Sequence, residues 1–313
     1  MLMRFQNSQE LFDEFETYYM DRCSQCNGLV EVSIEHVRVE VEEKYIDIEE
    51  IPMLKCTKCG NVVHTHYAKC IILGAYSQLI KSENVGVVSK PNGFRKRYSY
   101  AEENEFIYDH RDYESIPGLE VDMEHSEKGF LTPVYFNRNA LIYFVGDPNY
   151  KVDIFSESYG YMAKRDTQGY WEYEWGVPFG FNKNGKLVFW LGDLSTMDKF
   201  SRSLLKSFNQ ESDHLLIDSQ FYQAQMNCIF SEPIKERQII DNKEIFINNI
   251  RNKYSIDLAH LEEECNGHKS KVVRPRVFTE ESITGTINAL DKIIVEGFNV
   301  SELCKLYEFL YTS

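Results

Sequence analysis

Two Cys-x-x-Cys pairs near the amino terminus constrain the fold of this chain more than any other feature. The pairs consist of Cys23 with Cys26 and of Cys56 with Cys59, and a glycine follows each pair closely. Four thiolates at this spacing bind zinc tetrahedrally and stabilise a domain too small to fold on an apolar core alone. Because such a site has no open coordination position, we expect one structural Zn²⁺ ion rather than a catalytic one.

The segment between the two pairs has the alternation of β-strands. Val30, Val32 and Ile34 fall on one face, and Glu31, Ser33 and Glu35 fall on the other. The alternation changes phase near His36, which indicates a turn or a bulge. A redox-active cysteine pair normally opens a helix in a βαβ unit, and no such unit is predicted here. The pattern therefore favours a zinc ribbon.

Residues 23–60 resemble the YgiT-type zinc finger, a family with two Cys-x-x-Cys pairs around a β-hairpin. The resemblance implies that Cys23, Cys26, Cys56 and Cys59 are zinc ligands. Members of this family commonly occur in bacterial antitoxins, where the zinc domain contacts a toxin and a following helix-turn-helix binds DNA. No helix-turn-helix is recognised in residues 60–313, so the resemblance implies a ribbon of bacterial or phage type without implying DNA binding.

Composition and charge limit the partners. The chain has 313 residues, 43% of them hydrophobic, and a net charge of −15. This charge disfavours non-specific binding to nucleic acid and favours a basic protein partner. The amino terminus does not resemble a signal peptide, and no run approaches the roughly 18 apolar residues of a membrane span. Eight cysteines in such a chain predict a reducing compartment, with the cytoplasm as the expectation.

We expect an α+β fold in three parts. Residues 1–82 are predicted to hold an amphipathic helix, the zinc ribbon and a helix at 67–82. Residues 83–128 are predicted to form a linker and an acidic loop, and residues 129–313 a β-rich centre followed by a helical carboxyl-terminal third. The centre has β-prone runs at 130–135, 141–145, 170–175 and 186–191, and Asn182 to Gly185 predict a hairpin turn. The helices are expected at 196–208, 217–229, 233–254, 280–296 and 301–311.

The candidate catalytic residues are acids and one histidine in the centre: Asp193, Asp213, His214 and Asp218. Asp193 ends an apolar strand, where active-site acids often lie, but it is also placed to cap the following helix. Asp213 and His214 are adjacent and can form an acid–base pair, or can be solvated loop residues. Convergence of the four in one pocket would favour chemistry.

Two further metal sites and one basic patch remain alternatives. His64 and His66 would share a face of an extended segment, and Cys265 with His268 has the spacing of half a zinc site. The other half of that site would have to come from Cys228, Cys304 or His260. The basic residues Lys269, Lys271, Arg274 and Arg276 are the best candidate contact for nucleic acid, although a solvated loop offset by the preceding glutamates is the favoured interpretation.

Two functions fit this sequence. The first is a zinc-binding regulatory protein that acts through protein–protein contacts, with a toxin–antitoxin or phage-defence setting implied by the resemblance. The alternative is a metal-dependent, nuclease-like hydrolase with an active site in the central domain. The sequence carries no signature that decides between a binding protein and an enzyme.

Overall fold

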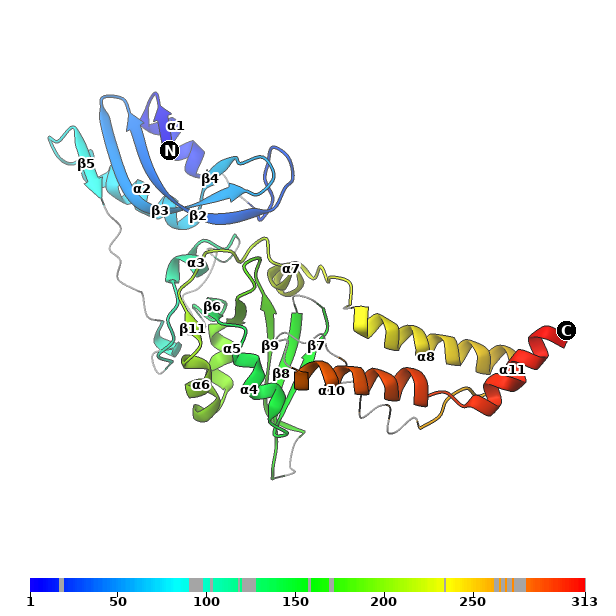
Figure 1. The fold of residues 1–313 in the computed structure, drawn as a ribbon. Coiled ribbons are helices and arrows are strands. Elements are labelled where there is room, and N and C mark those ends of the chain that lie inside the picture. Colours follow the sequence, from blue (N-terminus) through cyan, green and yellow to red (C-terminus); the bar gives the residue numbers. More distant parts are fainter. Residues whose placement is uncertain are drawn as a thin grey trace. The chain divides into compact units, whose positions relative to one another are not determined.

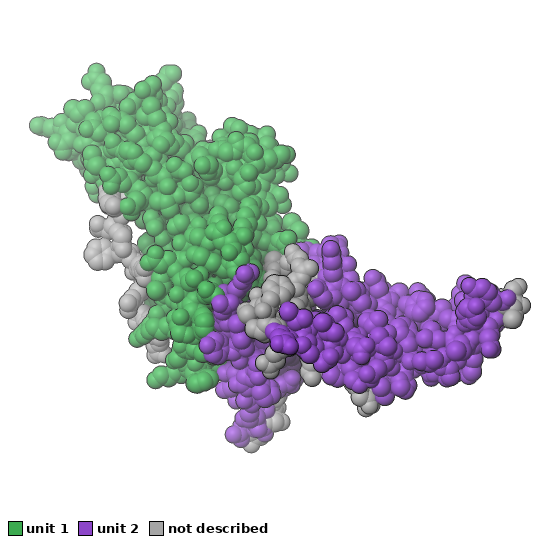
Figure 2. Space-filling view, in the orientation of Figure 1, with its two compact units in different colours: residues 1–137, 179–230 green, residues 138–178, 231–313 purple. Residues whose placement is uncertain are grey.

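A computed structural model describes residues 1–16, 20–89, 98–101, 104–117, 119, 128–156, 159–168, 172–233, 235–261, 265, 268, 272 and 280–312. The structure is 41% helical and 28% strand, with sheets and helices in both halves of the chain, which confirms the expected α+β class. The chain divides into two compact units (Figure 2). Unit 1 holds residues 1–137 and 179–230, and unit 2 holds residues 138–178 and 231–313. The predicted boundaries at residues 82 and 128 stay a prediction.

The first sheet of unit 1 contains the ribbon and is called the ribbon sheet here. Its strands are β1 (Leu2–Phe5), β2 (Val30–Val41), β3 (Lys44–Cys56), β4 (Val62–His64) and β5 (Gly86–Ser89). The order is β1-β2-β3-β4, and β5 pairs in parallel with β3 (Figure 1). The register of β2 against β3 shifts between Glu35 and Val37, which confirms the bulge expected near His36. Strand β5 lies in the segment that was predicted to be a linker.

Two helices cover the ribbon sheet with apolar side chains. They are α1 (Ser8–Glu16) and α2 (His66–Leu79). The shared core consists of Leu11, Phe15, Val37, Val39, Val41, Ile46, Ile48, Ile51, Met53, Ala68, Ile72, Tyr76 and Leu79. Helix α2 begins at an N-cap, Thr65, whose hydroxyl accepts a hydrogen bond from the Ala68 N–H at 3.0 Å. The ribbon sheet therefore has an apolar core of its own, away from the cysteines.

Unit 1 also holds β11, β6, β10 and the carboxyl-terminal part of β9, which are paired in this order. These strands of the second sheet are β6 (Pro133–Phe136), β9 (Tyr173–Phe181), β10 (Leu187–Trp190) and β11 (Asn209–Gln210). Strands β9 and β10 pair antiparallel around Asn182–Gly185, which confirms the predicted hairpin, and Gly185 has the positive φ of 72° that this turn requires. Four aromatic rings fill the core: Phe136, Phe179, Phe189 and Trp190 are all buried.

Several short helices precede, separate or follow these strands along the chain. They are η1 (Ser99–Ala101), α3 (His110–Glu114), α5 (Leu191–Thr196), α6 (Lys199–Lys206) and α7 (Gln220–Asn227). The helix expected at 196–208 corresponds to α6, and α5 is an additional short helix before it. Helix α3 lies in the segment 83–128 that was expected to be a linker and an acidic loop. A longer loop, residues 211–219, connects β11 to α7 and carries several of the candidate site residues.

Unit 2 combines a small β element with a helical part. It holds α4 (Ala140–Gly146), β7 (Tyr150–Ile154) and β8 (Tyr159–Arg165), with β8 between β7 and β9. Its helices are α8 (Lys235–Tyr254), α10 (Glu280–Asp291), the π-helical segment η3 (Lys292–Glu296) and α11 (Val300–Thr312) (Figure 1). Ile240 of α8 packs with Ala289 and Ile293 in a small apolar core.

The strand predicted at 141–145 is wrong, because these residues lie in helix α4. Leu141 and Phe144 are buried, whereas Ile142, Tyr143 and Val145 are about half exposed or more. Burial that recurs every third residue is helical, and it overrides the β-propensity of this apolar run.

Candidate functional site

The four predicted zinc ligands come together in unit 1. One sulfur from each of Cys23, Cys26, Cys56 and Cys59 lies within 4.8 Å of the others, and among the described residues this is the one group that could hold a metal ion. The sulfurs of Cys23 and Cys59 are 3.6 Å apart, and those of Cys26 and Cys56 are 3.5 Å apart. Four zinc–sulfur bonds of 2.3 Å in a tetrahedron place the sulfurs about 3.8 Å apart, so the cluster has the size of a zinc site.

The two cysteine turns have the same backbone pattern. The Asn27 N–H donates to the Cys23 carbonyl at 2.8 Å, and the Gly60 N–H donates to the Cys56 carbonyl at 3.0 Å. Both donors have positive φ, 55° at Asn27 and 74° at Gly60. Gly28 is required for close packing, since a Cβ on it would lie 2.9 Å from the Cys56 sulfur. These turns direct the four sulfurs toward one point.

Backbone N–H groups prepare one cysteine to bind metal. The N–H groups of Lys58 and Cys59 point at the Cys56 sulfur, at 3.4 and 3.5 Å. The Cys59 N–H has the largest effect, and together these contacts lower the pKa of Cys56 to about 6. A thiol with this pKa is a thiolate at neutral pH, which is the form that binds zinc. The number and spacing of the four sulfurs fit a closed tetrathiolate site.

The other predicted metal ligands do not join a group of three among the described residues. His64 is buried, its ring centroid 4.4 Å from that of Phe15, while His66 begins α2 and lies 3.5 Å from the Cys70 sulfur. The Cys265 thiol donates to backbone carbonyls, and no described side chain completes its predicted site with His268. Cys228 and Cys304 are exposed. The basic patch of Lys269, Lys271, Arg274 and Arg276 lies outside the described residues.

Three of the four candidate catalytic residues lie together on loop 211–219. Asp213 accepts hydrogen bonds from the Asn182 amide at 2.8 and 3.0 Å and from the Asn184 amide at 3.0 Å. Asp218 forms an ion pair with Lys183. The loop is thus fastened to the turn between β9 and β10 by two carboxylates.

His214 forms a buried pair with Asp112, an acid that is not among the predicted site residues. Its Nδ1 donates to a carboxylate oxygen of Asp112 at 2.7 Å, and the Ser212 hydroxyl donates to the other oxygen at 2.5 Å. The Asp112 side chain is 1% exposed and that of His214 is 18% exposed. Burial opposes the charged imidazole, but Asp112 and Asp109 favour it, and the pKa of His214 is raised. His214 also has a φ of 61°, an uncommon backbone conformation for this residue type.

Glu31 of β2 also lies at this loop. Its two carboxyl oxygens accept the N–H groups of Ile217, at 2.8 Å, and of Asp218, at 2.6 Å. The residue is only 5% exposed. Burial raises the pKa of Glu31 to about 8, against the opposing effects of the Ile217 N–H and of Lys183. We call Glu31, Asp112, Asp213, His214 and Asp218 the acidic cluster.

Asp193 makes no hydrogen bond or ion pair with the described residues of the acidic cluster. It lies in the first turn of α5, and its carboxylate makes no hydrogen bond or ion pair with a residue that the structure describes. The interpretation as a helix cap is wrong, because α5 begins at Leu191 and Trp190 occupies the N-cap position. Burial alone raises the pKa of Asp193 to about 6.

The side chain of Tyr135, on β6, lies close to the acidic cluster. It is fully buried, and its hydroxyl makes no hydrogen bond of ordinary geometry with a described residue. Burial raises its pKa well above the usual value, and Asp112, Asp213 and Glu31 add to that rise. The ammonium group of Lys186 lies 5.7 Å from the centre of its ring. Three acids of the cluster therefore lie near a tyrosine that stays neutral.

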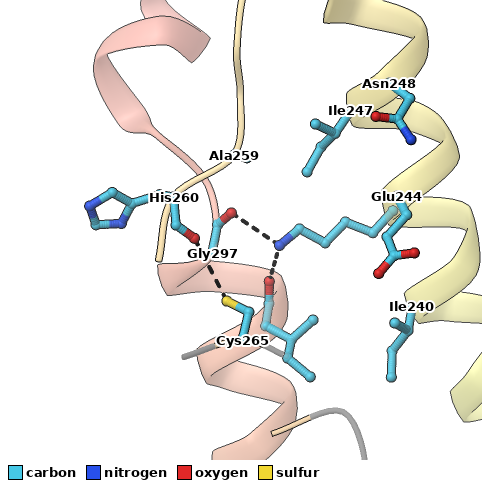
Figure 3. A pocket seen from close by; sticks show the side chains of 10 residues that line it. Ile240, Glu244, Ile247, Asn248, Ala259, His260, Cys265 and Gly297 are labelled. Atoms are coloured by element: carbon cyan, nitrogen blue, oxygen red, sulfur yellow. Dashed lines mark hydrogen bonds between the residues drawn. The ribbon is translucent and has the colours of Figure 1, made fainter. Parts of the chain in front are cut away.

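Unit 2 contains a pocket of about 290 Å³ that is lined by α8 and by Ala259, His260, Cys265, Ile293 and Gly297 (Figure 3). Lys243 lines this pocket and donates to the carbonyls of Ile293, at 2.5 Å, and Gly297, at 3.0 Å. Its ammonium group is also 4.7 Å from the centre of the Phe298 ring. The lysine thus satisfies carbonyl groups at the end of η3, which is a structural task.

Comparison of the chain with family models, curated proteins and solved structures yields no match. The interpretation of residues 23–60 as a ribbon therefore depends on the geometry of the four sulfurs. Within the described ranges, no helix combines the length and the apolar character that crossing a bilayer demands.

Proposed function

We propose that this chain is a zinc-binding regulatory protein whose ribbon holds one structural Zn²⁺ ion on Cys23, Cys26, Cys56 and Cys59. The observation that carries the proposal is the approach of all four sulfurs to within 4.8 Å of one another. Four thiolates fill the coordination sphere of zinc, so this ion would stabilise the two cysteine turns and would not activate a water molecule. A reducing compartment such as the cytoplasm suits this site and the absence of disulfides among the eight cysteines.

The regulatory role would be exerted through a protein partner. The net charge of −15 favours a basic partner over nucleic acid. A toxin–antitoxin or phage-defence assembly is the setting that the YgiT-type resemblance of residues 23–60 implies. The basic residues between 269 and 276 remain the candidate contact for nucleic acid.

Metal analysis of the purified full-length chain tests the zinc site. We expect about one zinc ion per chain, and Cys56→Ser should reduce the zinc content at least fivefold, because a site with three thiolates binds the ion more weakly. Cys304→Ser is the matched control, since Cys304 is exposed and lies on α11, and it should keep the full zinc content. Unchanged zinc content in Cys56→Ser would refute the ligand assignment.

Partner capture tests the regulatory role. The full-length chain, Cys56→Ser and Cys304→Ser would each be used to capture proteins from the native host. The role would be supported by a partner that binds the wild-type chain and Cys304→Ser but binds Cys56→Ser more weakly. The same partner should also bind the wild-type chain when it is added as a purified protein. Equal binding by all three proteins would place the contact away from the ribbon.

The Asp112–His214 pair favours a second candidate function, hydrolysis by general-base catalysis. A carboxylate that holds Nδ1–H orients the imidazole and leaves Nε2 to accept a proton from water. Among the described residues, the four cysteines are the one group that could hold a metal ion, so we assign the chemistry of this candidate to His214.

A panel of chromogenic esters and phosphodiesters tests the second candidate. We expect turnover that rises with pH as His214 loses its proton, and a loss of about 100-fold or more in kcat/KM for His214→Asn. Activity equal to that of the buffer, or full activity in His214→Asn, would reject it.

A further inference from the structure

The strongest unexplained feature of unit 1 is the buried contact between Glu31 and loop 211–219. The two residues that donate to Glu31, Ile217 and Asp218, are 186 and 187 positions away in sequence. Glu31 lies at the start of β2, where Lys55 of β3 is its cross-strand partner. A single carboxyl group thereby joins the ribbon sheet to the loop that carries His214.

The charges around Glu31 are mostly negative. Asp112 of α3 opposes its ionisation, and Lys183, from the turn between β9 and β10, favours it. Lys183 is at the same time the ion-pair partner of Asp218. One lysine thus offsets two carboxyl groups at this point, which leaves an ionised Glu31 poorly compensated in a site with little water.

The charges around His214 make its proton part of the same balance. Asp112 is its direct partner, and Asp109 also favours the charged imidazole, whereas Arg111 opposes it. Arg111 is held by Asp109 through contacts of 2.6 to 3.0 Å and donates to the Glu50 carbonyl of β3 at 3.1 Å. The imidazolium is therefore the cation that directly offsets Asp112.

We propose that Glu31, Asp112 and His214 form a proton-dependent contact that holds strand β2 on loop 211–219 when Glu31 and His214 are both protonated, and that weakens when either loses its proton. A neutral carboxyl group can still accept an N–H at each oxygen. Loss of the His214 proton leaves Asp112 uncompensated, and loss of the Glu31 proton adds a second negative charge beside it. The loss of either proton therefore weakens the contact.

The pKa shifts give the sign and the pH range. The pKa of Glu31 rises from 4.5 to about 8 in the closed contact, and that of His214 is also raised. The closed contact therefore binds more protons than an open one, and by linkage it is favoured below neutral pH and lost as the pH rises toward 9. From Glu31 alone, the equilibrium between open and closed contact should shift by roughly tenfold to a hundredfold between pH 6 and pH 9.

Amide hydrogen exchange of the zinc-loaded, full-length chain tests the proposal. The N–H groups of Ile217 and Asp218 report the contact directly, because both donate to Glu31. Protection factors, corrected for the pH dependence of intrinsic exchange, should fall at least tenfold from pH 6 to pH 9. Constant protection over this range overturns the proposal.

Three variants separate the contribution of Glu31 to the pH dependence from that of His214. Glu31→Gln cannot ionise and should remove most of the pH dependence, even though its amide can replace only one of the two accepting oxygens. His214→Asn keeps a donor toward Asp112, tolerates the positive φ and does not titrate, so it should remove the remainder. Glu43→Gln, at an exposed position in the same hairpin, should behave as wild type.

A pH-dependent loss of global stability would also lower the protection of these amides. An amide in the core of the second sheet distinguishes global unfolding from opening of the contact. The Phe189 N–H in β10 should keep its protection between pH 6 and pH 9 while those of Ile217 and Asp218 lose theirs. A parallel loss at all three amides, or full pH dependence in the Glu31→Gln/His214→Asn double variant, would refute the contact as proposed. Zinc content is measured on the same samples, so that a change in protection can be separated from a loss of the metal ion.

Discussion

Asp193→Asn should stabilise this protein, and the gain should depend on pH. Burial raises the pKa of Asp193 from 3.8 to about 6, and no described residue compensates the charge. This rise corresponds to about 3 kcal/mol. Because the folded form holds more protons than the unfolded form between these two values, the wild-type stability falls as the pH rises through this window. The asparagine variant has no carboxyl group and avoids this loss.

The gain can be calculated at two accessible pH values. The linkage relation gives about 1.5 kcal/mol at pH 5 and about 3 kcal/mol at pH 7.5. The amino-terminal position in α5 favours a carboxylate by about 0.3–1 kcal/mol, so the net gain at pH 7.5 is about 2–3 kcal/mol. Urea unfolding followed by tryptophan fluorescence measures it, because Trp190 is buried beside α5.

The neighbouring Asp198 supplies a control of opposite sign. It is the N-cap of α6 and accepts the N–H groups of Phe200 at 2.9 Å and Ser201 at 3.1 Å. Asp198→Ala should therefore lower the free energy of unfolding by about 1 kcal/mol. Equal stability of the wild type and Asp193→Asn at pH 7.5, or a gain that does not grow with pH, would refute the reasoning. A confirmed gain would mark Asp193 as an acid retained at a cost in stability, as functional acids often are.

Three further substitutions test the packing and the turns. Phe189→Ala should lower the free energy of unfolding by about 3–5 kcal/mol, since the ring is fully buried between Phe136 and Phe179, and chemical denaturation measures the loss. Gly185→Ala should lower it by about 1–2 kcal/mol, because φ is 72° at this position; an unchanged midpoint would contradict the turn. Thr65→Ala should lower it by about 1 kcal/mol through loss of the α2 cap, and restoration by Thr65→Ser would identify the hydroxyl as the cause.

Local signals predicted the elements that depend on few neighbours. The two Cys-x-x-Cys pairs, the bulge near His36 and the Asn182–Gly185 hairpin are all specified by residues within a short stretch of chain. Helix α4 was missed because its apolar, β-prone residues carry no clear period before the buried positions Leu141 and Phe144 are known.

The acidic cluster could be predicted only in part. Asp213 and His214 were selected as an acid–base pair from their adjacency, but the acid that holds His214 is Asp112, which is 102 positions away. Glu31 stands at an alternating strand position that is typical of a solvent-facing side chain. Its burial comes from a contact with Ile217, 186 positions away, which no local pattern can indicate.

The proposed zinc ion and the proposed Glu31 contact are adjacent in the structure, and this predicts a coupling between them. Val30 pairs with Cys56 across the hairpin, so the residue before Glu31 is held opposite a zinc ligand. The remainder of the ribbon sheet has its own apolar core with α1 and α2, and should stay folded without metal. Chelation of zinc should therefore lower the protection of the Ile217 amide while that of Val39, in the middle of the core, is kept. Loss of protection at both amides would mean that the metal stabilises the whole sheet, and loss at neither would mean that Glu31 is positioned without it.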